Sequence, residues 1–139
     1  MDLNREPQTI AHAAADEIRA ANHLALDVKS FYGENGRIGA APSNVSSTVD
    51  GLATLLERLP QTLEQTSRAL QHLEEQQAIR MANGGDPSEE VSVVLRALLN
   101  AQQAIVVAHG HMREAAGPLS NMGGHFLDDD ELEDADTAV

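Results

Sequence analysis

The chain has 139 residues and a mass of 14.8 kDa, which is the size of one domain. It contains no cysteine and no tryptophan, so disulfides, thiolate metal sites and a cysteine nucleophile are excluded. Its formal net charge is -13, from 9 basic and 22 acidic residues. Affinity for nucleic acid or anionic lipid comes from clustered Lys and Arg, so this balance argues against both as partners.

The acidic residues are concentrated at the C-terminal end. Seven of the 22 lie between Asp128 and Asp136, which leaves 15 acids against 9 bases, or -6, for residues 1–127. Such a run cannot bury apolar area, so residues 123–139 are expected to form a disordered acidic tail behind a helical domain of residues 1–122. Solubility, contact with a basic partner and no role at all remain open for this tail.

No segment predicts export or a membrane anchor. The N-terminus lacks an apolar run behind a basic start, and the longest uninterrupted apolar stretch, Ala104–Ala108, is about a quarter of a membrane span. We therefore expect a soluble cytoplasmic protein with no membrane partner. The abundance of Ala and Leu and the scarcity of strand signals predict an all-α fold.

The first helix is expected from about Pro7 to Phe31. It carries a stripe of apolar residues at three- and four-residue spacing: Ile10, Ala14, Ile18, Ala21, Ala25 and Val28. The turn residues Gly33-Glu-Asn-Gly36 end it.

The second helix is expected over residues 43–82, with Ser43 as its N-cap. Its apolar residues alternate in steps of four and three, a heptad seam: Val45, Val49, Leu52, Leu56, Leu59, Leu63, Thr66, Leu70, Leu73 and Gln77. At Pro60 two interpretations compete, a new helix that begins with this proline or one helix kinked there. No loop residue flanks Pro60, so we favour one kinked helix, ended by Asn83-Gly84-Gly85.

The third helix is expected over residues 87–116. Asp86 is its predicted N-cap, Pro87 its first residue, and Glu89 and Glu90 lie at the positive end of the helix dipole. Its heptad stripe consists of Val91, Val94, Leu98, Ala101, Ile105, Ala108, Met112, Ala115 and Leu119. Further apolar residues lie off this stripe, which is typical of an enclosed, central helix.

The helix lengths predict an antiparallel helical bundle whose tip is incomplete. A link of four residues forces the second and third helices into a coiled-coil hairpin, and the shorter first helix can cover only its base. The predicted interaction residues are the apolar residues left partly uncovered at the tip: Leu70, Leu73, Met81, Val91, Val94, Leu95 and Leu98. A patch of this size is rarely left open on a monomer, so we expect a homodimer; docking of another protein is the alternative.

No residue pattern predicts catalysis, a cofactor or a metal. His12 and His23 each precede an aspartate by four residues, a spacing better explained by exposed ion pairing. His109 and His111 point about 200° apart on a helix and cannot share an ion. The serine-hydrolase and phosphate-loop motifs are missing, so no catalytic, cofactor or metal site is expected.

One stretch resembles a known group of proteins. Glu57-Arg-Leu-Pro-Gln-Thr-Leu63, then Gly85-Asp86-Pro87 and the Ala- and Leu-rich helix up to Leu119, are similar to small helical proteins of unassigned role encoded on plasmids and integrative elements of actinomycetes. The resemblance covers about residues 57–119 and its motifs are structural, so it implies no activity and no site residue.

These features predict a non-catalytic interaction or adaptor protein that self-associates and serves a mobile-element or cellular complex. The alternative is an acidic inhibitor that imitates nucleic acid and blocks a DNA-binding protein. Such a mimic needs carboxylates along its folded surface, whereas over half of the net charge lies in the tail.

Overall fold

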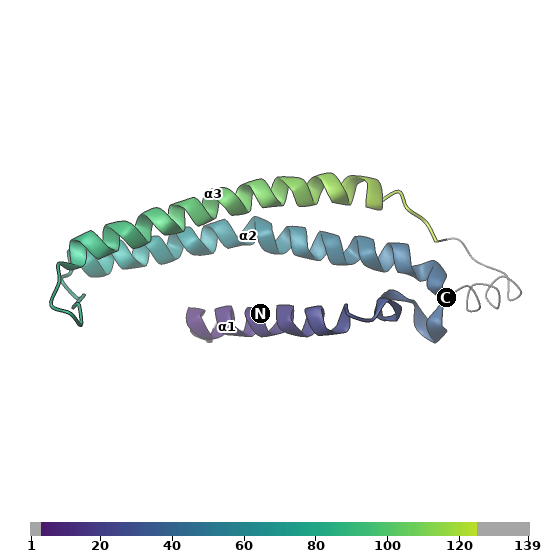
Figure 1. Ribbon diagram of the computed structural model, residues 1–139, viewed down its shortest axis with the longest axis horizontal. Coiled ribbons are helices and arrows are strands. Elements are labelled where there is room, and N and C mark those ends of the chain that lie inside the picture. The colour runs from purple at the N-terminus through teal and green to yellow at the C-terminus, as the bar shows by residue number, and fades with distance from the viewer. Residues whose placement is uncertain (1–3, 125–139) are drawn as a thin grey trace, which may run out of the picture. The chain divides into compact units, whose positions relative to one another are not determined.

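The computed structural model describes residues 4–124, and within them the protein is all-α, with three α-helices and no named strand (Figure 1). The predicted tail falls almost wholly on residues 125–139, outside the described residues. The chain divides into two compact units. Of the described residues, 4–45 and 122–124 belong to one and Ser46–Asn121 form the other.

The first unit contains α1 (Pro7–Leu24), which ends earlier than predicted. Asp27 has an extended backbone (φ -101°, ψ 112°), and its carboxylate accepts a 2.9 Å hydrogen bond from the backbone N–H of Lys29. This bond starts the 3₁₀-helix η1 (Val28–Phe31). The expected helix over 7–31 is therefore wrong beyond Leu24, because a local side-chain bond at Asp27 replaces the helical backbone bonds.

A compact loop follows η1 and includes the short 3₁₀-helices η2 (Glu34–Gly36) and η3 (Ile38–Ala40). Asn35 and Gly36 both have positive φ angles, 62° and 72°. They return the chain so that Gly33 donates its N–H to the carbonyl of Arg37 at 3.0 Å. The predicted turn at Gly33–Gly36 is thus confirmed.

Helix α2 (Ala41–Glu75) passes through Pro60 without a break, as predicted. It starts before the predicted N-cap Ser43, because Pro42 fits the first turn, where no backbone N–H has a helical partner. It ends at Glu75 instead of residue 82. Gln77 adopts a left-handed conformation (φ 55°), and Ala78 donates its N–H to the carbonyl of Leu73 at 2.9 Å. This is a Schellman motif without glycine, and it leaves Met81 in a loop.

Helix α3 (Pro87–Leu119) starts as predicted. Asp86 is its N-cap and accepts a 3.0 Å hydrogen bond from the N–H of Ser88, with Pro87 in the first turn. The helix continues past the expected end near residue 116. Pro118 lies in the last turn, and beyond it Ser120 still donates its N–H to the carbonyl of Ala116 at 3.0 Å.

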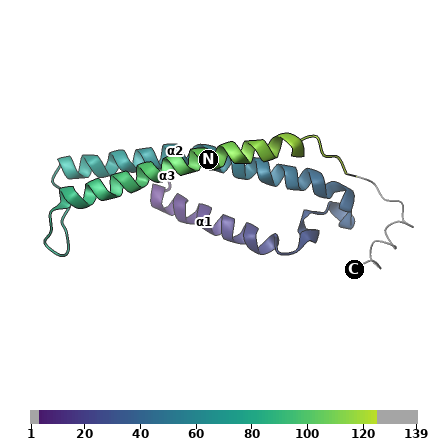
Figure 2. The same ribbon diagram turned by 45° about the horizontal axis from the view of Figure 1, so that its top comes forward.

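Within the second unit, α2 and α3 run antiparallel and side by side in both views (Figures 1 and 2). Ala53 of α2 is fully buried and Val91 of α3 is 4% exposed; these are the only buried residues among those described. A series of half-buried residues of α2, at three- and four-residue spacing, continues the side of Ala53: Val49, Leu56, Pro60, Leu63, Ser67, Leu70 and Glu74. Thr54, Leu55 and Leu59 beside this series are half-buried as well.

This facing side differs from the predicted seam. The seam residues Val49, Leu56, Leu63 and Leu70 face α3 as expected, but Leu52 and Leu73, three residues after the first and the last of them, are exposed. Residues outside the predicted seam, such as Ala53 and Ser67, take inward positions instead. Small side chains there permit a close approach of the two helices.

Helix α3 meets the length and composition required of a membrane-spanning helix. Its most apolar stretch of 18 residues has a mean hydropathy of 1.6, and 6% of that stretch is buried. An apolar helix of a soluble protein meets the same requirement, so this property alone assigns no location.

Candidate functional site

The predicted interaction residues divide into three kinds in the structure. Val91 is buried inside the hairpin, so it stabilises the helix pair itself. Leu73 and Val94 are 46% and 43% exposed. The remaining four are half-buried: Leu70, Met81, Leu95 and Leu98. Of the seven predicted residues, Leu73 and Val94 are therefore the most exposed.

Helix α3 is not enclosed by its neighbour, contrary to expectation. Within the second unit α2 covers only one side of it, and four large apolar residues of α3 are more than half exposed: Val93, Leu99, Val106 and Val107. A helix that is apolar nearly all round normally has neighbours on more than one side. The hairpin supplies one such neighbour.

Two rows of side chains run along the hairpin beside the facing residues. The leucine row of α2 consists of Leu52, Leu55, Leu59, Thr62, Thr66, Ala69 and Leu73. The alanine row of α3 consists of Val94, Ala97, Ala101, Ala104 and Ala108. Neither row contains a charged residue, and Leu52, Leu73 and Val94 are among the exposed large apolar residues.

Both rows lie on the same side of the hairpin. In each helix the row residues lie three positions after an inward residue or one position before one, as Leu59 follows Leu56 and Ala104 precedes Ile105, which is a turn of about 60–100° in one direction. The ion pair between Asp50 and Arg113 (3.5 Å) is made by residues one position after an inward residue, about 100° in the other direction. Since this pair joins the two helices across one side, the two rows share the opposite side.

The charged residues of α2 lie away from the rows. Glu57, Arg58, Glu64 and Arg68 all occupy other sides of the helix, and Arg68 pairs with Glu64 at 2.5 Å. The hairpin therefore has one uncharged side and one charged side. We call the two rows together the uncharged face.

The uncharged face was only partly predicted. Leu73 and Val94 were identified at the tip, and Leu52, Leu59, Ala101 and Ala108 were assigned to the seams. Ala97 and Ala104 were not identified. The sequence pattern did indicate this face. The apolar residues of α2 fit the alternation of four and three in two registers, so a single neighbouring helix cannot bury all of them and some remain for a second neighbour.

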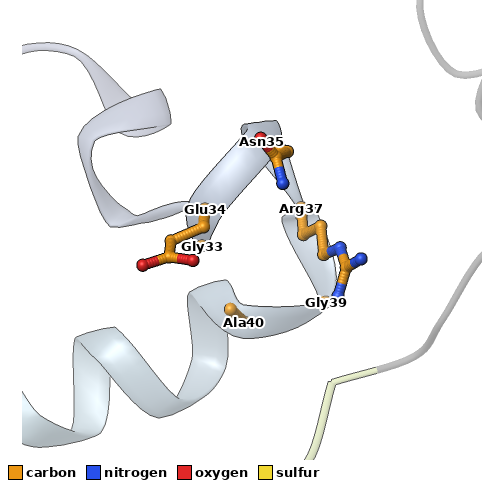
Figure 3. Close-up of a pocket in the computed structure, with 6 residues that line it drawn as sticks. All are labelled: Gly33, Glu34, Asn35, Arg37, Gly39 and Ala40. Atoms are coloured by element: carbon orange, nitrogen blue, oxygen red, sulfur yellow. The ribbon is translucent and has the colours of Figure 1, made fainter.

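A small hollow in the first unit shows no arrangement of side chains that would bind a ligand. It has a volume of about 310 Å³ and is lined by Gly33, Glu34, Asn35, Arg37, Gly39 and Ala40. The Glu34 and Arg37 side chains point away from one another (Figure 3), and both residues are exposed. No buried polar group is aimed into the hollow to orient a ligand.

The histidines do not form a metal site in the part of the chain that the structure describes. No group of three or more His, Asp or Glu side chains lies close enough there to hold an ion. His111 contacts Glu114 at 3.1 Å on the exposed surface of α3.

Comparison with known proteins identifies no relative. No protein-family model, no curated protein and no solved structure matches this chain.

Proposed function

We propose that this protein is a non-catalytic, cytoplasmic interaction module that self-associates through its helical hairpin and acts as an adaptor in a mobile-element or cellular complex. The observation that carries the proposal is the uncovered apolar surface of the hairpin, which includes Leu73 and Val94 near its tip and four more exposed residues of α3, Val93, Leu99, Val106 and Val107. Exposed contiguous apolar surface of this kind marks interaction sites in soluble proteins.

The chemistry of α2 supports a soluble hairpin. Glu57, Arg58, Glu64 and Arg68 lie on a helix that runs beside α3, and such charges are costly inside a bilayer. An apolar α3 is then explained by protein neighbours on several sides. A helical bundle, completed by further helices around the hairpin, is the arrangement that this explanation requires.

Light scattering over a range of protein concentrations tests the self-association. We expect twice the chain mass of 14.8 kDa, unchanged by added salt, because the uncharged face has no charge to screen. Leu73→Asp shifts the protein towards the monomer, because it places a charge on the exposed apolar tip. The matched control is Gln65→Asp, an exposed position of α2 outside both rows. A monomer at every concentration would refute self-association.

The adaptor role is tested with the same variants as baits in a lysate of the native host. A stoichiometric partner that binds the parent and the Gln65→Asp control at high salt, but not Leu73→Asp, supports it. A captured basic protein that dissociates as salt rises contradicts the proposal and identifies an electrostatic mimic.

A further inference from the structure

We propose that the uncharged face binds a second copy of this chain, with the leucine row of each copy packed against the alanine row of the other. This inference rests on the proposed self-association and names the surface that performs it. The two-fold axis runs parallel to the helices, so that each α2 lies across from the α3 of the second copy.

The hairpin fixes which residues face one another in such a dimer. Asp50 and Arg113 lie at the same height along the hairpin, because their side chains form an ion pair. Since the helices are antiparallel, each residue further along α2 is at the height of the residue one position earlier in α3. Leu59 is therefore level with Ala104, and Leu55 with Ala108. A two-fold axis parallel to the helices keeps these levels, so Leu59 faces Ala104 of the second copy.

The facing residues match in size in the middle of the face, between Leu55 and Ala69. The large Leu55 and Leu59 meet the small Ala108 and Ala104, and towards the tip the small Ala69 is level with Val94. Large side chains opposite small ones fill space without voids in a packed core. A two-fold axis perpendicular to the helices would instead pack α2 against α2 and α3 against α3. The facing leucines would then hold the two α2 helices apart, and the facing alanines would leave gaps between the two α3 helices.

Burial of the row is inexpensive for its polar members. The Thr66 hydroxyl already donates to the carbonyl of Thr62 at 2.8 Å in its own helix. A hydroxyl with a partner loses little when water is removed. The ionisable residues Glu90 and His111 continue the alanine row at its two ends, level with Leu73 and Leu52, so they lie at the rim of the face and not in its middle.

The area suffices for a stable dimer. From Leu52 to Leu73 the face is about 32 Å long, and two helices side by side are about 20 Å wide. The footprint of about 640 Å² per copy gives about 1,300 Å² in total, within the roughly 1,200–2,000 Å² of stable complexes.

The opposite side of the hairpin is the poorer candidate. There Leu99 and Val106 of α3 stand among charged residues of both signs: Asp50, Glu57, Glu64, Arg68, Arg96 and Arg113. Two copies joined through that side would have to remove water from these charged side chains along its length, which is unfavourable.

Cross-linking of the full chain tests the register. The protein has no cysteine, so Leu59→Cys and Ala104→Cys each introduce a single thiol. After the two variants are mixed and oxidised, we expect a disulfide-linked species of twice the chain mass. Gln65→Cys mixed with Ala104→Cys is the matched control and gives little of it. Equal cross-linking in both mixtures would overturn the proposed face.

A pair of substitutions on α3 separates this inference from the proposed function. Ala104→Glu puts a charge on the alanine row at an exposed position, so the hairpin stays folded while the dissociation constant rises about 30-fold, the effect of losing about 2 kcal/mol at an interface. Its control, Gln103→Glu, is the exposed neighbour off the row. If Ala104→Glu dimerises like the parent, this face is refuted while self-association stands. If the parent is a monomer, both fail.

Discussion

Replacement of Pro60 by alanine is expected to stabilise the protein. Pro60 lies inside α2, where proline is about 3 kcal/mol less favourable than alanine, because it removes a backbone hydrogen bond and crowds the carbonyl of Leu56. Two losses oppose this gain. The half-buried ring contributes about 1 kcal/mol of burial, and the unfolded chain regains about 0.5 kcal/mol of freedom. The net expectation for Pro60→Ala is an increase of about 1.5 kcal/mol in the free energy of unfolding.

Pro42 provides the matched control. It lies in the first turn of the same helix, where a proline removes no helical hydrogen bond. Pro42→Ala therefore keeps only the unfavourable change in the unfolded chain, a loss of about 0.5 kcal/mol. Urea denaturation of both variants at one fixed protein concentration measures the difference, since self-association adds to the apparent stability. If Pro60→Ala is no more stable than Pro42→Ala, α2 is not continuous through residue 60 in solution.

Three further predictions follow from single contacts. Asp86→Ala lowers the free energy of unfolding by about 1 kcal/mol because it removes the side-chain acceptor for the Ser88 N–H, whereas Asp86→Asn keeps an acceptor and loses less; urea denaturation that fails to separate the two would refute the cap. Val91→Ala costs about 2 kcal/mol at a buried site, while Val93→Ala, 56% exposed, changes stability by less than about 0.5 kcal/mol in the same assay; equal effects would contradict the packing of α3. The full chain stays in the soluble fraction when mixed with liposomes and floated on a density gradient, and recovery with the lipid would refute the protein-neighbour explanation for the apolar α3.

Local sequence signals predicted the helix starts better than the helix ends. Asp86 before Pro87 gives the backbone a cap and a preset φ angle, and both act where the sequence places them. The end of α2 depends on Gln77 in a left-handed conformation, which glycine adopts far more readily than glutamine. The sequence offered Gly84 instead, and this residue also has a positive φ (72°), but it lies in the loop after the helix has ended. Glycine thus marked a turn correctly and the helix end wrongly.

The candidate site was predicted as a tip and is better described as a face. Helix lengths indicated that something near residues 70–98 would stay uncovered, and Leu73 and Val94 are exposed there. Which side of each helix faces the other is decided by the fit of Ala53 and Ser67 against α3, a three-dimensional property that periodicity alone does not contain. The predicted seam through Leu52 and the observed one through Ala53 both follow an alternation of four and three residues, so the pattern does not distinguish them.

The two departures from expectation, the shifted seam and the uncovered α3, have one physical origin. A helix with a single neighbour needs one apolar stripe, whereas α2 and α3 each carry more than one. The hairpin buries the stripe that brings small residues such as Ala53 between the helices, and the leucines of the other register are left beside it. Because the helices are antiparallel, the leucine row of α2 and the alanine row of α3 fall on one side, whereas Leu99 and Val106 of α3 are exposed on the other. The apolar residues that a helix pair leaves exposed indicate that it has further neighbours, and the second copy proposed above is the neighbour that we expect on this face.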